Sequence, residues 1–167
     1  MPDNKPPVYY WDSCVFLALV NKEPDRLPLI DAAMAEAERG KIEIHTSTFT
    51  IAEVAFAAEE SAPGSTLDDE VLRRIDKLWT PGASPLRFVE FHHGVGIRAR
   101  DVIRAALVAG THKPSGADAV HIASALDRGV DELHTYNLAD YLPVCGVLGL
   151  QAKHPEPLVP TLDYTRE

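Results

Sequence analysis

The sequence predicts an α/β fold in which helices cover both faces of a central, mostly parallel sheet of about five short strands, a three-layer α/β/α arrangement. Short runs of β-branched and aromatic residues alternate with longer helical segments along most of the chain. This alternation is typical of parallel sheets. The length of 167 residues suits one domain with a sizeable core, and a content of 46% hydrophobic and 25% charged residues is typical of globular proteins.

The first half of the chain is predicted to begin with a strand and to alternate from there. In order, the expected elements are a strand at Val8–Trp11, a helix at Ser13–Val20, a helix over residues 25–39 that ends at Gly40, a strand at Ile42–His45 and a helix over residues 51–60. β-branched and aromatic residues mark the strands, and the following glycine marks the end of the second helix. The segment 51–60 is apolar on nearly every helix face, which predicts that it is buried.

The second half continues the alternation. The expected elements are an amphipathic helix over residues 67–79, a strand at Leu86–Phe91, helices over residues 95–109 and 117–128, a strand at Glu132–Thr135 and a last strand at Val147–Leu150. We interpret residues 1–150 as one domain. Residues 151–167, which include Pro155, Pro157 and Pro160, are interpreted as a C-terminal tail.

The composition excludes some functions and favours a location. The net charge of −9 argues against a general nucleic-acid coating protein, because nonspecific affinity comes from neutralising phosphates. It leaves a nuclease open, since bound divalent metals and a local basic stripe supply positive charge. No apolar run is long enough to span a membrane, and the N-terminal MPDNKPP lacks the layout of a signal peptide. With only two cysteines, of which Cys14 is expected to be a buried free thiol, a cytoplasmic protein is expected.

Three acidic residues stand alone in apolar segments. They are Asp12 in VYYWDSCVFLALV, Glu53 in TIAEVAFAA and Asp118 in GADAVHIASA. An ionised carboxylate that is buried without a partner costs several kcal/mol, so such acids are paired, protonated or bound to metal. None of the three segments contains Arg or Lys, although one can arrive from elsewhere in the fold.

Helix capping is the alternative explanation for each of these acids. Ser115 with Asp118, and Thr50 with Glu53, both have the spacing of a capping box. Asp12 is placed to cap the helix that follows it. Acids at these positions also interact favourably with the helix dipole, by roughly 0.3–1 kcal/mol.

In addition to these three acids, a pair of polar residues follows the strand at Glu132–Thr135. Asn137 and Asp140 are three residues apart in TYNLAD, which suits either one pocket or an Asx turn that starts a short helix. Ligands of parallel sheets gather at the carboxyl ends of the strands, where these acids are expected. Converging carboxylates stay ionised only around cations, and oxygen ligands without a Cys or His cluster suit Mg²⁺ or Mn²⁺. Such ions promote phosphodiester hydrolysis.

The order and setting of these motifs resemble the PIN-domain ribonucleases, above all the VapC-type toxins of bacterial toxin–antitoxin modules. The matching pieces cover roughly residues 8–150. They are the strand that ends in Asp12-Ser13, the motif Thr50-Ile-Ala-Glu53-Val, the segment GIRARDVIRAALVAGTHKPSGADAVHIASA and HTYNLADY. The resemblance implies a metal-dependent endoribonuclease that is the toxin of a pair, a homodimer, and a protein silenced by a small antitoxin.

The resemblance also implies roles for single residues. Asp12, Glu53 and Asp118 would bind Mg²⁺ or Mn²⁺, with Ser13 and Thr135 as supporting hydroxyls. Many members carry an acid where this chain has Asn137, whereas others, with a Thr-x-Asn-x-x-Asp pattern, carry one at the place of Asp140; the resemblance therefore implies weaker binding of a second metal here. We therefore assign the fourth metal position to Asp140, with Asn137 assisting. His121, three residues after Asp118, is expected in the core.

Four basic residues could contact RNA. Arg98, Arg100 and Arg104 lie on one predicted helix, and Lys113 follows in the next loop. One interpretation is a solvated face on which Asp101 pairs with Arg98 or Arg104. The other is a basic rim that steers RNA phosphates toward the acids.

Three other functions compete with the toxin. One is a catalytically weak or inactive PIN-like module that binds RNA or protein, and another is a PIN nuclease in RNA maturation. The third is a phospho-accepting receiver domain, which needs paired acids after the first strand, whereas Asp12 stands alone.

Overall fold

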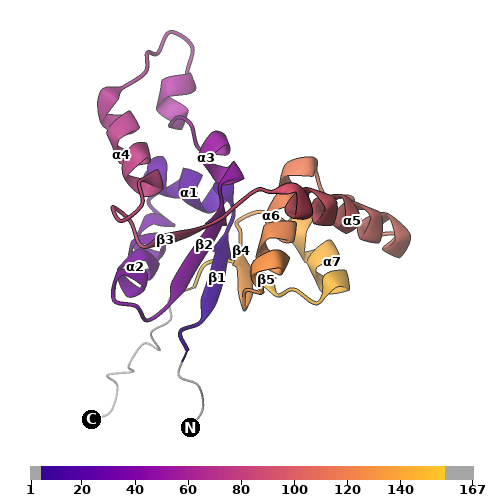
Figure 1. Cartoon of the computed structure of the whole chain (residues 1–167). Helices are drawn as coiled ribbons and strands as arrows, with labels where there is room; N and C mark the ends of the chain where they lie inside the picture. The colour runs from indigo at the N-terminus through magenta and orange to yellow at the C-terminus, as the bar shows by residue number, and fades with distance from the viewer. Residues whose placement is uncertain (1–4, 157–167) are drawn as a thin grey trace, which may run out of the picture.

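The fold is built on one five-stranded parallel sheet (Figure 1). The structure is a computed structural model that describes residues 5–156. The strands are β1 (Val8–Trp11), β2 (Glu43–Ser47), β3 (Leu86–Val89), β4 (Glu132–His134) and β5 (Ala152–Lys153). Their order is β3-β2-β1-β4-β5, and all neighbours are parallel. The prediction of a parallel sheet of about five short strands is confirmed.

Helices cover both faces of this sheet (Figure 1). On one face lie α1 (Ser13–Val20), α2 (Leu27–Glu38) and α4 (Asp69–Trp79), and on the other lie α5 (His93–Ala109), α6 (Gly116–Arg128) and α7 (Leu138–Leu148). The short α3 (Phe49–Glu53) and the 3-10 turn η1 (Ala58–Ser61) follow β2. The predicted three-layer α/β/α architecture is confirmed.

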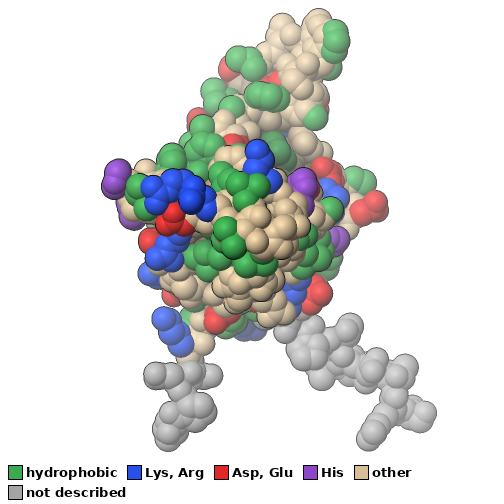
Figure 2. Space-filling view, turned by 90° about the vertical axis from the view of Figure 1, so that its right-hand side faces the viewer, with side chains coloured by type: hydrophobic (Ala, Val, Ile, Leu, Met, Phe, Trp, Pro, Cys, Tyr) green, Lys and Arg blue, Asp and Glu red, His purple; other side chains and the backbone are tan. Residues whose placement is uncertain are grey.

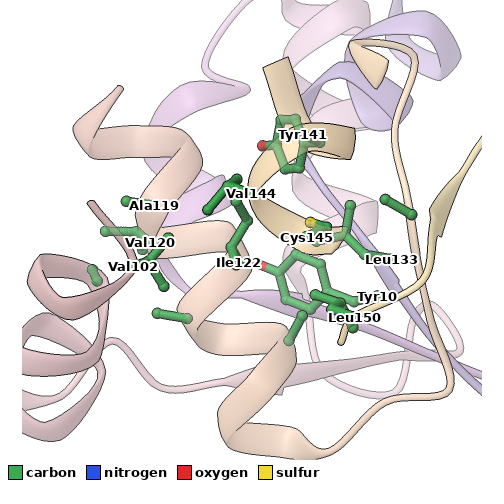
Figure 3. Close-up of a cluster of buried hydrophobic side chains, with 14 of the residues drawn as sticks. Tyr10, Val102, Ala119, Val120, Ile122, Leu133, Tyr141, Val144, Cys145 and Leu150 are labelled. Carbon is green, nitrogen blue, oxygen red and sulfur yellow. The ribbon is translucent and has the colours of Figure 1, made fainter. Parts of the chain in front are cut away.

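The alternation of side chains along β1 explains why there are two cores. Tyr10 points into the core under α5, α6 and α7, where it lies with Tyr141 and Leu133 (Figure 3). Tyr9 and Trp11 belong to the core on the opposite face, beneath α1, α2 and α4. Successive side chains of a strand point to opposite faces, so one short buried run anchors both layers.

The predicted buried helix over residues 51–60 is wrong. The helix ends at Glu53, and Val54 has φ −106° and ψ 61°. Val54 and Ala57 are buried, whereas Ile51 and Phe56 are 38% and 48% exposed. The chain turns here because tertiary contacts replace the helical hydrogen bonds: the backbone N–H of Ala58 donates to Oδ1 of Asn21, at 2.8 Å.

The predicted last strand at Val147–Leu150 is also wrong. Residues 147–148 complete α7, Gly149 ends that helix in the left-handed conformation at φ 70°, and β5 follows at Ala152–Lys153. The sequence did not predict a helix over the full length of α7, because proline normally interrupts a helix and α7 contains Pro143. The sheet thus extends beyond residue 150 into the segment interpreted as a tail. The part of that segment with Pro157 and Pro160 lies outside the described residues.

Two buried histidines predict that the fold loses stability in mild acid. Nε2 of His45 lies 2.9 Å from Oε2 of Glu43, and Nε2 of His134 lies 2.9 Å from Oε2 of Glu132. Burial nevertheless lowers the pKa of both imidazoles from 6.5. The unfolded chain therefore binds more protons than the folded one below about pH 6.5, and stability must fall as the pH falls through that region.

We expect urea unfolding to give a smaller free energy of unfolding at pH 5.5 than at pH 7.5. A double variant, His45→Gln with His134→Gln, should depend less on pH over that interval. An equal pH dependence in both proteins would contradict this assignment.

Candidate functional site

The candidate site lies where the direction of chain connection reverses. From β1 the sheet grows outward through β2 to β3, and the chain then returns to β4 on the other side of β1. The crevice at the carboxyl ends of two such strands is the usual binding place in open α/β sheets. Asp12 directly follows β1, and Thr135 directly follows β4.

Asp12 is buried and held by two neutral donors. It is 3% exposed. Its Oδ2 accepts a hydrogen bond of 2.6 Å from the Thr135 hydroxyl, and its Oδ1 accepts one of 2.7 Å from the Cys14 thiol. Asp12 precedes α1, but its side chain caps no backbone N–H. Within residues 5–156 it forms no ion pair with Lys, Arg or His.

Glu53 reaches the same region from the end of α3. Its Oε2 lies 2.7 Å from Nε2 of His121 on α6. The helix is tied to β1, because the Thr50 hydroxyl lies 2.8 Å from that of Thr46, which donates to the carbonyl of Trp11 at 2.8 Å. The capping box expected from Thr50 is absent, since the residue before α3 is Thr48.

Asp118 does form the expected capping box. Its Oδ2 accepts from the hydroxyl and the backbone N–H of Ser115, at 2.6 Å and 3.2 Å, while its own N–H donates to the Ser115 hydroxyl. Oδ1 of Asp118 makes no hydrogen bond to other described residues. Capping therefore occupies only one of its two oxygens.

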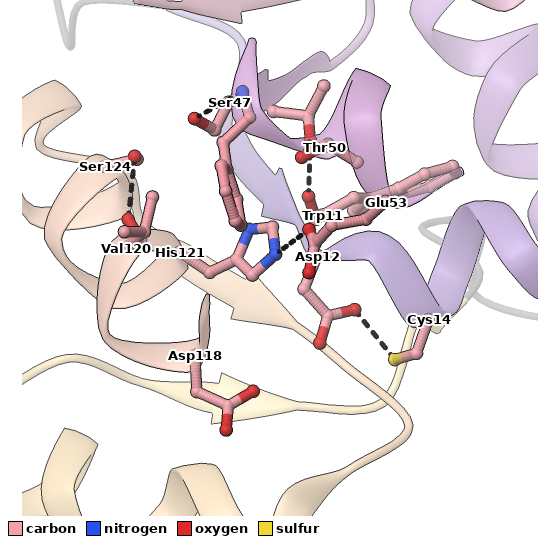
Figure 4. A network of polar contacts seen from close by, with 12 residues as sticks. Trp11, Asp12, Cys14, Ser47, Thr50, Glu53, Asp118, Val120, His121 and Ser124 are labelled. Carbon is pink, nitrogen blue, oxygen red and sulfur yellow. Dashed lines mark hydrogen bonds and ion pairs between the residues drawn. The ribbon is translucent and has the colours of Figure 1, made fainter. Parts of the chain in front are cut away.

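Asp12 and Asp118 face the same space (Figure 4). Tyr141 on α7, a residue that is only 1% exposed, lies near both of them. Burial raises the pKa of Tyr141, and the charges of Asp12 and Asp118 raise it further. Both carboxylates thus act on one phenol, which no pattern in the sequence associates with them.

The predicted pair of Asn137 and Asp140 is connected to Asp12 through Thr135. The backbone N–H of Asn137 donates to the Thr135 hydroxyl at 2.9 Å, and its side-chain amide donates to Oδ2 of Asp140 at 2.6 Å. Oδ1 of Asp140 lies 3.2 Å from Nε2 of His112. Asn137 is the residue before α7, but its side chain accepts no capping hydrogen bond, so the alternative of an Asx turn is wrong: the amide is turned toward Asp140 instead.

The donor set fits a hydrated hard cation. Within residues 5–156, no three His, Cys, Asp or Glu side chains stand close enough to enclose a bare ion. Mg²⁺ typically keeps several waters and binds through one or two carboxylates, so it needs no such cage. A buried Asp12 without a cationic partner is the feature that calls for a cation.

The Cys14 thiol does not turn this site into one for a soft metal. Burial raises its pKa to about 12, and the neighbouring Asp12 contributes to the shift. The thiol therefore stays protonated at neutral pH and donates its hydrogen bond, whereas zinc ligation requires a thiolate. The predicted free thiol is present but only partly buried, and its contact with Asp12 was missed.

Comparison with known proteins identifies the family. The profile of the PIN domain matches residues 9–139. The chain belongs to the PIN domain family. No curated protein matches the chain.

Solved structures with the same fold include toxin–antitoxin complexes. One is DNA-bound VapBC from Salmonella typhimurium, with a TM-score of 0.64, 15% identity, and coverage of 89% of this chain and 98% of that one. VapBC2 from Rickettsia felis, bound to a promoter DNA fragment, has a TM-score of 0.63, 15% identity, and coverage of 88% and 98%. VapC20 from Mycobacterium tuberculosis, a Sarcin-Ricin loop cleaving toxin, has a TM-score of 0.54 and 13% identity, and the match covers 77% of this chain and 89% of that one.

The four basic residues predicted to contact RNA are exposed, three on α5 and one in the loop that follows it. Arg98, Arg100, Arg104 and Lys113 all lie at the surface. The predicted pairing of Asp101 with Arg98 or Arg104 is wrong. Asp101 pairs with Arg100 instead, at 2.8 Å. Adjacent side chains meet here because both reach along an exposed helix surface. On the face shown in Figure 2, Lys and Arg are interspersed with acidic and hydrophobic side chains.

The Ser13 hydroxyl, predicted as a supporting group, makes no hydrogen bond to the residues that the structure describes.

Among residues 5–156, no helix is long and apolar enough to cross a membrane.

Thr135 offers a test of how the PIN site is held together. It is fully buried, donates to Asp12 and accepts from the N–H of Asn137. Thr135→Val should cost about 1–3 kcal/mol of stability, because the N–H loses its acceptor. It should also weaken metal affinity or activity by about 10–100-fold. Thr135→Ser keeps the hydroxyl and is the matched control, and both are compared by urea unfolding and Mn²⁺ titration. Equal behaviour of the two variants would contradict this role.

Proposed function

We propose that this PIN-domain chain is a metal-dependent endoribonuclease that hydrolyses RNA phosphodiester bonds and acts as the toxin of a toxin–antitoxin pair. The observation that carries the proposal is the buried Asp12 carboxylate, which has only neutral donors around it and faces Asp118 at the switch point of the sheet. A site of this charge is stable when it holds a cation.

The carboxylates of Asp12, Glu53, Asp118 and Asp140 would hold Mg²⁺ or Mn²⁺, directly or through water. When bound, such a metal polarises the phosphate and lowers the pKa of a bound water, which supplies the nucleophile. The protein orients these ligands: Thr135 and Cys14 donate to Asp12, and Asn137 donates to Asp140. Ser13 is assigned a supporting role at the start of α1.

The RNA must approach a protein of net charge −9. We assign its phosphate contacts to Arg98, Arg104 and Lys113, which form no ion pair with other described residues, and to Arg100, which must share its charge with Asp101. Because α5 packs against α6, the helix that carries Asp118, positive side chains on α5 would steer phosphates toward the carboxylates. A cytoplasmic location follows from the proposed substrate.

An antitoxin is proposed because VapBC complexes share the fold over most of this chain. A groove between α1, α2 and α4 suits a partner segment. It includes a hollow of about 310 Å³ with an apolar lining of Leu19, Val20, Leu27 and Leu78, and its charged residues are three basic ones and one acid, Lys22, Arg74, Lys77 and Asp31. Such a surface fits an amphipathic helix that carries acidic residues. We further propose that the toxin is a homodimer.

A weaker PIN module, or one used in RNA maturation, is the alternative. It is favoured by one observation: Asn137 contributes an amide donor to Asp140 rather than a second negative charge. Fewer charges lower the affinity for a second cation.

Cleavage of a mixed pool of structured RNA by the purified protein tests the proposed function. Reactions contain Mg²⁺, Mn²⁺ or chelator, and an Asp118→Asn protein prepared in parallel controls for contaminating nuclease. We expect cleavage with either metal, none with chelator and none with the variant. Equal cleavage by both proteins, or none under any condition, would overturn the ribonuclease. A small open reading frame beside the gene would support the toxin over RNA maturation.

A further inference from the structure

His121 forms a buried bridge between the core and Glu53. The imidazole is 1% exposed. Its Nε2 lies 2.7 Å from Oε2 of Glu53, and its Nδ1 lies 2.8 Å from the hydroxyl of Tyr10 (Figure 4 draws the imidazole turned toward Glu53). Tyr10 is fully buried in β1, two residues before Asp12. The sequence predicted the burial of His121 but not its carboxylate partner.

The hydrogen bonds around Tyr10 decide which nitrogen of His121 carries the proton. The backbone N–H of Ser47 donates to the Tyr10 oxygen at 3.1 Å. Among the described residues the Tyr10 hydroxyl is hydrogen-bonded to no acceptor other than Nδ1 of His121, so its own proton is donated there. A neutral imidazole with Nδ1 as acceptor has its proton on Nε2, where it points at Glu53. The hydrogen bonds then run in one direction, from the Ser47 N–H through Tyr10 and His121 to Oε2 of Glu53.

Glu53 needs such an external support. It is the last residue of α3, a helix of only 5 residues, and the backbone leaves helical geometry at the next residue, Val54. The Glu53 side chain is 22% exposed, so water reaches it and its rotamers are not fixed by packing. A long carboxylate side chain loses considerable conformational entropy when it is ordered. A hydrogen bond from the buried His121 imidazole restricts the orientation of the Glu53 carboxylate, which the short helix alone does not restrict.

The bridge also couples two metal-ligand candidates. His121 lies on α6 three residues after Asp118, so one helix carries Asp118 and the group that fixes Glu53. α6 itself packs closely against α5 and contributes Ile122 and Ala123 to the core. The distance between the two carboxylates is thus set by a rigid element rather than by α3.

We propose that His121, in its Nε2–H form fixed by Tyr10, is the positioning residue that aims Glu53 at the metal site. This inference rests on the proposed function, because it assumes that Glu53 binds a divalent cation. Groups that hydrogen-bond to metal ligands typically contribute about 10–100-fold to metal affinity. A purely structural role for His121 would leave that affinity unchanged as long as the fold is intact.

Two variants of similar size and polarity separate these roles. In His121→Gln the side-chain amide reaches the place of Nε2 and can still donate to Glu53. In His121→Asn the amide reaches only the place of Nδ1, so it keeps the Tyr10 contact and loses Glu53. Free Mn²⁺ is titrated by electron paramagnetic resonance with each full-length protein, after circular dichroism and thermal unfolding have established that it is folded.

We expect His121→Asn to bind Mn²⁺ about 10–100-fold more weakly than the wild type, and His121→Gln to stay within about threefold. Long-range ¹H–¹⁵N spectra of the wild type should report the Nε2–H tautomer, a result that needs no variant to fold. Equal Mn²⁺ affinity of folded Asn and Gln variants, or an Nδ1–H tautomer, would overturn the positioning role.

The same titration keeps this inference distinct from the ribonuclease. A wild-type protein that binds Mn²⁺ but cleaves no RNA would contradict the ribonuclease, and the comparison of the Asn and Gln variants would still decide the role of His121. A wild-type protein that binds no Mn²⁺ would overturn both proposals.

Discussion

Replacing Asp12 by Asn is expected to lower the rate of RNA cleavage by about a thousandfold, because a metal supplies several kcal/mol of transition-state stabilisation and each 1.36 kcal/mol is worth about a factor of ten. The substitution keeps the size of the side chain and one acceptor oxygen. It removes the charge of a carboxylate that is only 3% exposed. The fold should persist, since Thr135 and Cys14 are neutral donors that need no counter-charge.

Thermal unfolding with and without Mn²⁺ gives a second measurement of the same prediction. A ligand that binds only the folded protein stabilises it by about 2.7 kcal/mol at a concentration of 100 times its Kd. Wild-type protein should therefore melt at a higher temperature in Mn²⁺, and Asp12→Asn should lose most of this shift. Asp76→Asn, which removes an exposed carboxylate of α4, is the matched control and should keep both the shift and the activity. A folded Asp12→Asn protein with wild-type cleavage would contradict the site.

Most of the fold could be predicted because its signals are local. The run VYYW between Pro7 and Asp12 identifies β1, and the glycine after residue 39 ends α2. The failures occur where tertiary contacts decide. β5 has only two residues, Ala152 and Lys153, and it exists because it pairs with β4. α7 contains Pro143, which argues against a helix unless packing compensates.

For the candidate site, the sequence identified the acidic residues but not the residues that contact them. Lone acids in apolar segments are visible in the sequence, so Asp12, Glu53 and Asp118 could be chosen in advance. Their partners were not visible, because contacts such as those of Thr135 with Asp12 and His121 with Glu53 join residues 123 and 68 positions apart. No periodicity reports which buried polar groups meet across a parallel sheet.

Asp118 is where the sequence left two interpretations open, and the structure makes them separable. Ser115 engages only Oδ2 of Asp118, which leaves Oδ1 for a metal or its water. The two roles depend on different properties of the side chain: capping needs an acceptor oxygen, and metal binding needs the negative charge. Asp118→Asn keeps an acceptor oxygen and loses the charge, whereas Ser115→Ala loses the capping hydroxyl and keeps the charge.

We therefore expect opposite effects from these two neighbours. Ser115→Ala should lower the free energy of unfolding by about 1 kcal/mol, the usual loss of a helix cap, and should keep cleavage within a few-fold of the wild type. Asp118→Asn should change stability by less than about 1 kcal/mol and should lower cleavage by about a thousandfold. Urea unfolding and RNA cleavage are measured on both proteins in Mn²⁺. If Ser115→Ala lost activity as completely as Asp118→Asn, the carboxylate would act through the helix start, and the acid cluster at the end of β1 would lose one of its members.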